Sequence, residues 1–363
     1  MEFVNNTFIY FFAFIIVLTI IVFVHEFGHY FAAIINKVKV ETFSIGFGKE
    51  IFGWTDKRGT RWKIGYLPLG GYVKMFGEDV LNKKKIPKNQ AKYAFSEKKL
   101  HQRFIIVLAG PLANFILGII GYAFIYTFIG ISHISPVINE VLKDTPAYSA
   151  GLKNGDKILQ IDNRKIKSFF DIGQIINVYK KPDFNFTILR ENTEIIKKIT
   201  PVIVVQEIYG QERDIRKIGI TSFESEKRKY NFFYSLYLGS KSTYNICHLT
   251  IEALSQLITG KGSVDDLGGP VKIAHFSGKM FQEGFLSFLN LIILLSISIG
   301  LINLFPLPVL DGGHLVMYLV EGIIGKPINA DIQKLAFKIG FIIIITLAVL
   351  LTYNDILSLF KLW

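Results

Sequence analysis

The chain has 363 residues, of which 50% are hydrophobic and only 19% are charged, and its mean hydropathy is +0.38. An ordinary soluble domain could not bury so much apolar surface, so the composition predicts a membrane protein. The only cysteine, Cys247, excludes an intrachain disulfide and a cysteine-based zinc module, so a metal site would need histidine and carboxylate ligands.

Four apolar segments are long enough to cross about 30 Å of hydrocarbon, which takes roughly 20 helical residues. The expected spans are residues 8–35, 104–131, 285–310 and 335–353. The first lacks the basic region and cleavage site of a signal peptide, so we expect it to remain as a span. Residues 231–259 are apolar in stripes interrupted by charged residues, which predicts an amphipathic surface helix rather than a fifth span.

The basic residues indicate the orientation of the chain. Residues 36–103 contain 16 Lys and Arg against 6 Asp and Glu, which predicts that this loop is cytoplasmic and that the N-terminus lies outside. Residues 131–284 then lie outside, residues 311–334 lie on the cytoplasmic side, and the C-terminus is outside. Most of the net charge of +12 therefore faces anionic lipid, and no nucleic-acid partner is expected.

The external region resembles one PDZ domain of the bacterial type. Its predicted order is a strand at 137–142, a short helix after Thr145, a strand at 157–161, a helix at 168–179, and paired strands at 184–189 and 194–205. The segments Ala150-Gly151-Leu152 and Gly155-Asp156 add to the resemblance. Such domains bind a peptide as an added strand, so a peptide C-terminus is a candidate partner.

The sharpest chemical signal is His25-Glu26-Phe27-Gly28-His29 in the first span. On a helix, His25 and His29 lie on one face and can bind a single zinc ion, while Glu26 lies beside it to take a proton from a water molecule. The alternative is a pair of buried histidines at a helix contact. That alternative leaves a glutamate inside an apolar segment unexplained.

A catalytic zinc site needs a third protein ligand. Asp311 is the best candidate, because it follows a span that approaches the same side of the membrane as His25. A competing ligand is His314, since imidazole also binds zinc. The other alternative is that Asp311 caps a helix that starts near Gly312.

Two prolines interrupt the end of the third span. Pro306 and Pro308 lack backbone donors and cannot continue a regular helix, so we expect extended chain just before Asp311. Irregular backbone at membrane depth must be buried or line a water-filled cavity. Asn303, Pro306 and Pro308 are therefore predicted to handle substrate, and the alternative is that they merely end a span at the interface.

Five short motifs occur in order along nearly the whole chain: the His25 to His29 pentapeptide, Gly46-Phe47-Gly48, Gly70-Gly71-Tyr72-Val73-Lys74-Met75, Gly110-Pro111-Leu112-Ala113-Asn114, and Leu310-Asp311-Gly312. Together they resemble the bacterial site-2 proteases, most closely the regulator of sigma-E protease type. The enterobacterial form has two tandem PDZ domains, whereas this chain has room for one.

The resemblance implies an intramembrane zinc metalloprotease of the bacterial cytoplasmic (inner) membrane, with one Zn2+ per chain and the zinc site toward the cytoplasm. Its substrates would be single-span membrane proteins, for example an anti-sigma factor or remnant signal peptides. The segment 64–75, with Gly70, Gly71 and Tyr72, resembles the family's membrane-reentrant β loop, which would pair with substrate. The alternative is an ordinary hairpin. Asn114 would hydrogen-bond a developing oxyanion, or would hold helices together.

The expected fold is a polytopic α-helical membrane protein with four transmembrane helices, a membrane-associated β loop and one external PDZ-like α+β domain. The expected divisions are 1–131 with the zinc motif, 132–222 as the PDZ-like domain, 223–284 as an amphipathic helical linker, and 285–363 with the third ligand. Two rival functions are a PDZ adaptor, which leaves Glu26 and Asp311 unexplained, and an ion transporter, for which internal repeats would be expected but none is visible.

Overall fold

The computed structural model describes residues 2–78, 86–179, 181–208, 211–223, 226–259 and 268–360. The contacts divide the chain into two compact units. One combines Met1–Phe124 with Phe232–Trp363, and the other is Ile125–Asn231. Each unit is described by itself.

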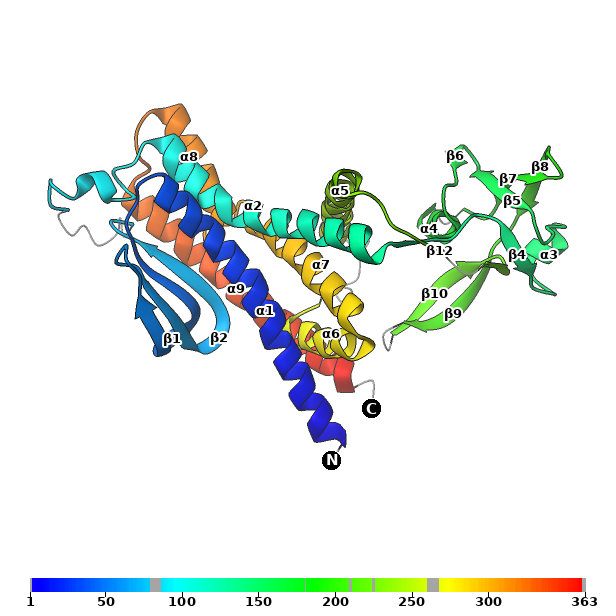
Figure 1. Cartoon of the computed structure of the whole chain (residues 1–363), viewed down its shortest axis with the longest axis horizontal. Helices are drawn as coiled ribbons and strands as arrows, with labels where there is room; N and C mark the ends of the chain where they lie inside the picture. The colour runs from blue at the N-terminus through cyan, green and yellow to red at the C-terminus, as the bar shows by residue number, and fades with distance from the viewer. Residues whose placement is uncertain are drawn as a thin grey trace. The chain divides into compact units, whose positions relative to one another are not determined.

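The first unit is built of long helices with a β hairpin beside α1 (Figure 1). Its helices are α1 Glu2–Ile35, α2 Leu100–Phe124, α5 Phe232–Ile258, α6 Pro270–Glu283, α7 Phe285–Asn303, α8 Asp311–Ile324 and α9 Ala330–Phe360, with a short 3-10 turn at Ala91–Tyr93.

Among the described residues, four helical stretches are long and apolar enough to cross a membrane, as the sequence predicts. They are Phe8–Ile35, Leu100–Ile129, Phe285–Asn303 and Ala330–Leu357. The predicted third span, 285–310, is too long: α7 ends at Asn303, because Pro306 and Pro308 cannot continue the helix. The α5 helix is not among the four, in keeping with its predicted amphipathic character.

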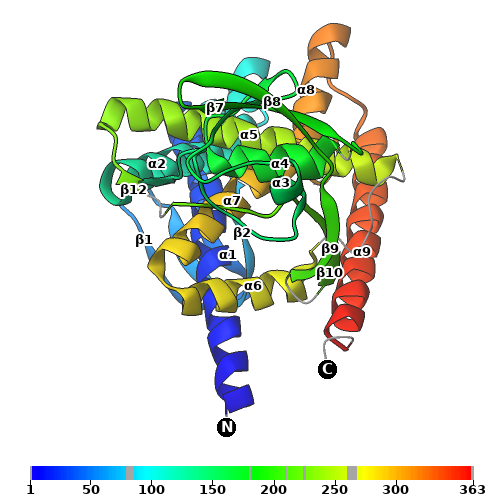
Figure 2. The ribbon, with the colours of Figure 1, turned by 90° about the vertical axis from the view of Figure 1, so that its right-hand side faces the viewer.

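The α2 helix lies at the centre of this unit and packs against α1, α5, α7 and α8. Glycines at the contacts allow the helices to pack this closely. A Cβ on Gly239 of α5 would lie 2.6 Å from the Ile119 carbonyl oxygen, and one on Gly121 would lie 2.6 Å from the Ile293 side chain. The α6 helix crosses from α1 to α9 (Figure 2), where buried Asp355 accepts hydrogen bonds from the first amides of α6.

The hairpin of β1 Val40–Thr55 and β2 Arg61–Met75 forms a bent sheet against α1. Each strand contributes two segments, since Phe43 lies opposite both Trp62 and Val73. The resulting segment order is 50–55, 61–65, 40–47 and 71–75, which leaves 71–75 at one edge. Buried Phe43 stacks on Trp62 with their ring centroids 4.3 Å apart and so anchors the sheet.

The second unit contains the mixed domain expected outside the membrane. Its core sheet has the order β6-β5-β7-β8 and buries Ile158, Ile161, Phe186 and Ile188. Its elements are β3 Ile131–His133, β4 Ile138–Val141, α3 Pro146–Ser149, β5 Lys157–Ile161, β6 Arg164–Lys165, α4 Phe169–Tyr179, β7 Phe184–Arg190, β8 Thr193–Ile199, β9 Val202–Ile208, β10 Gln211–Lys217, β11 Ile220–Ser222 and β12 Glu226–Arg228.

The predicted strand, helix, strand, helix, strand, strand order is present in this unit, although its identity as a PDZ domain stays a prediction. The predicted strand 194–205 is wrong in extent. It is divided into β8 and β9 at Thr200-Pro201, because proline cannot donate to the ladder. The unit extends beyond 132–222 on both sides, since β3 pairs with β12.

Candidate metal centre

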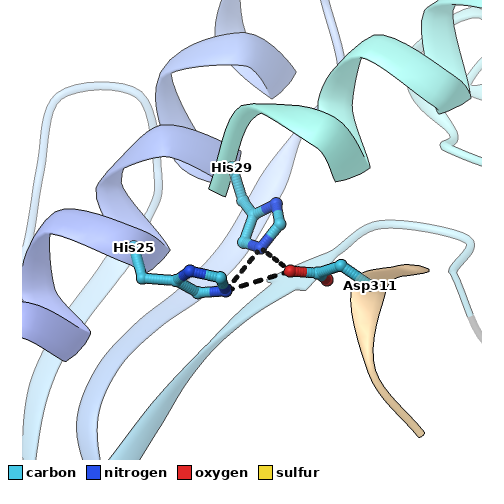
Figure 3. Close-up of side chains that lie close together, drawn as sticks. All are labelled: His25, His29 and Asp311. Atoms are coloured by element: carbon cyan, nitrogen blue, oxygen red, sulfur yellow. Dashed lines mark hydrogen bonds and ion pairs between the residues drawn. The ribbon is translucent and has the colours of Figure 1, made fainter. Parts of the chain in front are cut away.

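Two helices bring three potential ligand atoms together (Figure 3). Nε2 of His25 lies 3.2 Å from Nε2 of His29, both on α1. The Oδ2 atom of Asp311, in the first turn of α8, lies 3.1 Å from the first nitrogen and 3.5 Å from the second. Among the described residues, only these three form a group that could hold a metal ion.

The separations of these atoms fit zinc. In a tetrahedral site with bonds of about 2.0 Å, neighbouring ligand atoms lie about 3.3 Å apart. The three measured separations, 3.1, 3.2 and 3.5 Å, bracket that value. Asp311 Oδ2 is buried and has no hydrogen-bond partner, which a cation between the three side chains would supply.

The orientation of His29 suits a metal ligand. Its Nδ1 donates a hydrogen bond of 2.9 Å to the carbonyl oxygen of Ile106 on α2. The proton is assigned to Nδ1 because a carbonyl can only accept, which leaves the lone pair of Nε2 facing His25 and Asp311. A backbone carbonyl behind a ligating histidine is a common arrangement in metal sites.

Asp311 faces the histidines rather than capping a helix. The N-cap of α8 is Leu310, with no side-chain capping bond, and Asp311 is the first residue of the helix. The positive end of the α8 dipole favours an ionised carboxylate there. His314, the competing ligand, lies in the wall of the adjoining cavity but outside the group of three.

The loop before Asp311 differs from the prediction of extended chain. Residues 304–310 form successive turns, with hydrogen bonds from Leu307 N to Phe305 O and from Leu310 N to Leu307 O. This loop folds back over the start of α8. Cβ atoms on Gly312 and Gly313 would lie 2.3 Å from carbonyl oxygens of the loop, so both positions require glycine.

Glycines in α1 and α2 make room for the histidines, and sequence reasoning did not find this role. A Cβ on Gly28 would lie 2.3 Å from the Ala109 carbonyl oxygen, and one on Gly110 would lie 2.3 Å from Nε2 of His29. The two helices therefore touch at the metal site. The only signal was the presence of both glycines in the motifs, because small residues mark close helix contacts in membranes.

A cavity of about 560 Å³ adjoins the three ligand atoms. Glu26 lines it beside the two histidines, and a Cβ on Gly71 of β2 would lie 3.2 Å from Glu26 Cγ. Burial raises the pKa of the Tyr318 hydroxyl in the wall, so that this hydroxyl stays protonated at neutral pH. Water and an extended peptide could both meet the metal centre here.

Only some of the predicted substrate-binding residues line this cavity. Tyr72 and Asn303 line it, whereas Pro306 and Pro308 do not. Gly71 lies against α1 beside Glu26, and Gly70 lies against the ring of Phe47. Asn114 does not line the cavity either: it is fully buried, and its amide nitrogen lies 3.5 Å from Nδ1 of His25.

An ion pair in the cavity wall was not predicted. Nη2 of Arg103 on α2 lies 2.5 Å from Oε1 of Glu321 on α8, and the Arg103 guanidinium covers the ring of Tyr318. The pair joins α2 to the helix that carries Asp311. Nothing in the local sequence indicates it, because the two charges are 218 residues apart in the chain and meet only in the tertiary fold.

Known proteins resemble this chain over most of its length. The family model of peptidase family M50 matches residues 13–347. A protein named "Putative zinc metalloprotease" from Rickettsia conorii is 42% identical over 96% of this chain and 98% of its own length. One of the same description from Agrobacterium fabrum is 38% identical over 95% of both chains, and "Metalloprotease MmpA" of Caulobacter vibrioides is 33% identical over 94% of this chain and 93% of its own.

Replacing Gly110 by alanine should displace the His29 ring, because the new methyl group would lie only 2.3 Å from Nε2. We expect Gly110→Ala to lose most of its bound zinc, measured by metal analysis of the purified protein. Gly121→Ala, in the same helix, is the matched control. Its methyl group would press on Ile293 of α7, away from the histidines. Full zinc content in Gly110→Ala would show that the helix contact does not position His29.

Proposed function

Because this chain belongs to peptidase family M50, whose members use zinc, we propose that it is an intramembrane endopeptidase with a metal centre of His25, His29 and Asp311. One observation carries the proposal. The ligand atoms of the three side chains lie 3.1 to 3.5 Å apart, and two of them, with Glu26 beside them, belong to a helix long and apolar enough to span a membrane. Ionisable groups at such a depth are costly and are retained for function.

The chemistry follows from the residues around the cavity. Zinc, when bound, acts as a Lewis acid that acidifies a water molecule and polarises the scissile carbonyl. Glu26 is the general base that takes the proton of the attacking water and later passes it to the leaving amine. Its position next to His25 on α1, with its side chain in the same cavity, brings the carboxylate to the reacting atoms.

The edge segment 71–75 of β2 is the proposed docking strand for substrate. A membrane helix already satisfies its own backbone hydrogen bonds, so it must unwind before its peptide bond can be attacked. An unwound segment can pair with an open sheet edge as an added strand. Tyr72 and Val73 at this edge line the cavity, which would carry the paired segment past Glu26.

The outer part of the hairpin supports its proposed contact with the membrane. Large apolar side chains are exposed there, in contrast to an ordinary solvated hairpin. They are Phe47, Ile51, Phe52, Trp54, Tyr66 and Leu67. A hairpin that enters the lipid headgroup region would cover these side chains and would meet a substrate helix as it leaves the bilayer.

The proposed substrates are single-span proteins of a bacterial cytoplasmic membrane, such as an anti-sigma factor or a remnant signal peptide. We place the termini and the PDZ-like unit outside and the metal centre toward the cytoplasm, because the loop of residues 36–103 carries a net charge of +10 (16 − 6). The PDZ-like unit would bind a peptide C-terminus or limit access by size. A non-catalytic adaptor is disfavoured because it has no use for Glu26 beside three ligands.

The catalytic assignment predicts different results for two substitutions. His25→Ala removes a ligand and should lose zinc, whereas Glu26→Gln should keep zinc and lose proteolysis by at least about 100-fold, in line with the loss of a general base. Both are measured on the purified protein in liposomes with a single-span substrate. Comparable cleavage by Glu26→Gln would refute the assignment of the base.

Asn303 and Pro308 should affect substrate rather than metal. Asn303→Ala removes an amide from the cavity wall, and Pro308→Ala relaxes the loop that shapes it. Each variant is expected to crosslink less to a photoreactive substrate helix and to cleave it more slowly, with zinc content near one per chain. A parallel loss of zinc and activity would mean that this loop mainly holds Asp311 in place.

The orientation can be tested with cysteine labelling in a Cys247→Ser background. Lys57→Cys lies in the exposed turn of the hairpin, and Lys143→Cys lies on the surface of the PDZ-like unit. A membrane-impermeant maleimide added to spheroplasts should label the cysteine at position 143 and should reach position 57 only after permeabilisation. The reverse pattern would overturn the proposed topology.

A further inference from the structure

The amide of Asn114 is buried beside a proposed ligand in an unusual way. The residue is fully buried in α2, its Nδ2 lies 3.5 Å from Nδ1 of His25, and its Oδ1 has no hydrogen-bond partner. Buried polar atoms of folded proteins nearly always have a hydrogen-bond partner. No hydrogen bond to Oδ1 therefore fixes which end of the amide faces the His25 ring.

The orientation of the Asn114 amide decides which nitrogen of His25 carries the proton. With Nδ2 toward the ring, His25 Nδ1 must accept a hydrogen bond, so its proton sits on Nε2, the atom that faces His29 and Asp311. With Oδ1 toward the ring, Nδ1 carries the proton and donates it to Oδ1, and Nε2 is left free. The oxygen and nitrogen of an amide are interchangeable in shape, so this choice follows from the hydrogen bonds.

Residues one and two turns before Asn114 in α2 position the other histidine, His29. Ile106, Gly110 and Asn114 are spaced by four residues and lie on one face of the helix. Ile106 supplies the carbonyl that accepts from His29 Nδ1, and Gly110 supplies the space for the His29 ring. One turn further along the same face, the amide of Asn114 meets Nδ1 of His25, as the Ile106 carbonyl meets Nδ1 of His29.

The α7 helix holds Asn114 against His25. The hydroxyl of Ser296 donates a hydrogen bond of 3.1 Å to the backbone carbonyl of Asn114. One turn later, a Cβ on Gly300 would lie 3.0 Å from Asn114 Cβ, so the α7 backbone approaches residue 114 closely. This packing leaves the amide little freedom to turn away from the ring.

We infer that Asn114 is a positioning residue whose Oδ1 accepts the Nδ1 proton of His25 and so keeps Nε2 free to bind metal. The inference rests on the proposed function and differs from the oxyanion role expected for Asn114 from the sequence. An oxyanion donor must reach the substrate, but Asn114 does not line the cavity, whereas the amide of Asn303 does. Partners of this kind typically change metal affinity 10- to 100-fold.

Two substitutions separate the possible roles. Asn114→Asp keeps an oxygen acceptor and loses the amide donor, while Asn114→Leu keeps the approximate size and loses both. Zinc affinity of the full-length protein in detergent is measured by competition with a chelator. We expect the Leu variant to bind zinc 10- to 100-fold more weakly and the Asp variant to stay within a few-fold of the unmodified protein. Zinc X-ray absorption should show two imidazole ligands in the Asp variant.

Asn290→Leu on α7 is the matched control, because the amide of this half-buried asparagine donates to the Leu286 carbonyl within its own helix. It should bind zinc normally. Equal zinc affinity in Asn114→Leu, Asn114→Asp and the unmodified protein would overturn the inference, with lost cleavage pointing to an oxyanion role. Equal weakening in both Asn114 variants would overturn it as well. Unchanged zinc binding in His25→Ala would instead refute the metal centre itself.

Discussion

The close approach of α1 to α2 is the contact on which the rest of the site depends. Gly28 lets the backbones meet, and Gly110 leaves space for the His29 ring, so that the Ile106 carbonyl can fix the orientation of that ring. In a bilayer, apolar helix surfaces gain little from leaving lipid, and packing of small residues is what brings helices together. Here the same packing also supplies the polar partners that buried imidazoles require.

The second requirement is that a carboxylate from a distant segment reaches this contact. The turns at residues 304–310 reverse the chain after α7, and the glycines at 312 and 313 let α8 begin directly beneath them. Asp311 then faces the histidines from a helix start, where its negative charge is favoured. The ion pair between Arg103 and Glu321 ties the same helix to α2, so two separate contacts hold α8 at the site.

The cavity reconciles two opposing demands that the proposed intramembrane proteolysis makes on the structure. The spans must be apolar on their lipid faces, yet hydrolysis needs water and an unwound substrate. The extended sheet edge at 71–75, the irregular loop after α7 and the first turn of α8 form a wall on one side of the ligands. The polar chemistry is thereby confined to the interior of the helical unit.

The sequence alone determined the features that depend on local periodicity. The lengths of the apolar segments predicted four spans, and the spacing of His25 and His29 placed both imidazoles on one helix face, because a helix repeats every 3.6 residues. The sequence also proposed Asp311 as their partner, but only the tertiary structure separated it from His314, and only the tertiary structure decided where α7 ends and that Asn114 faces His25 rather than the cavity. Those outcomes depend on how closely separate helices approach, and a linear pattern of residues does not encode that distance.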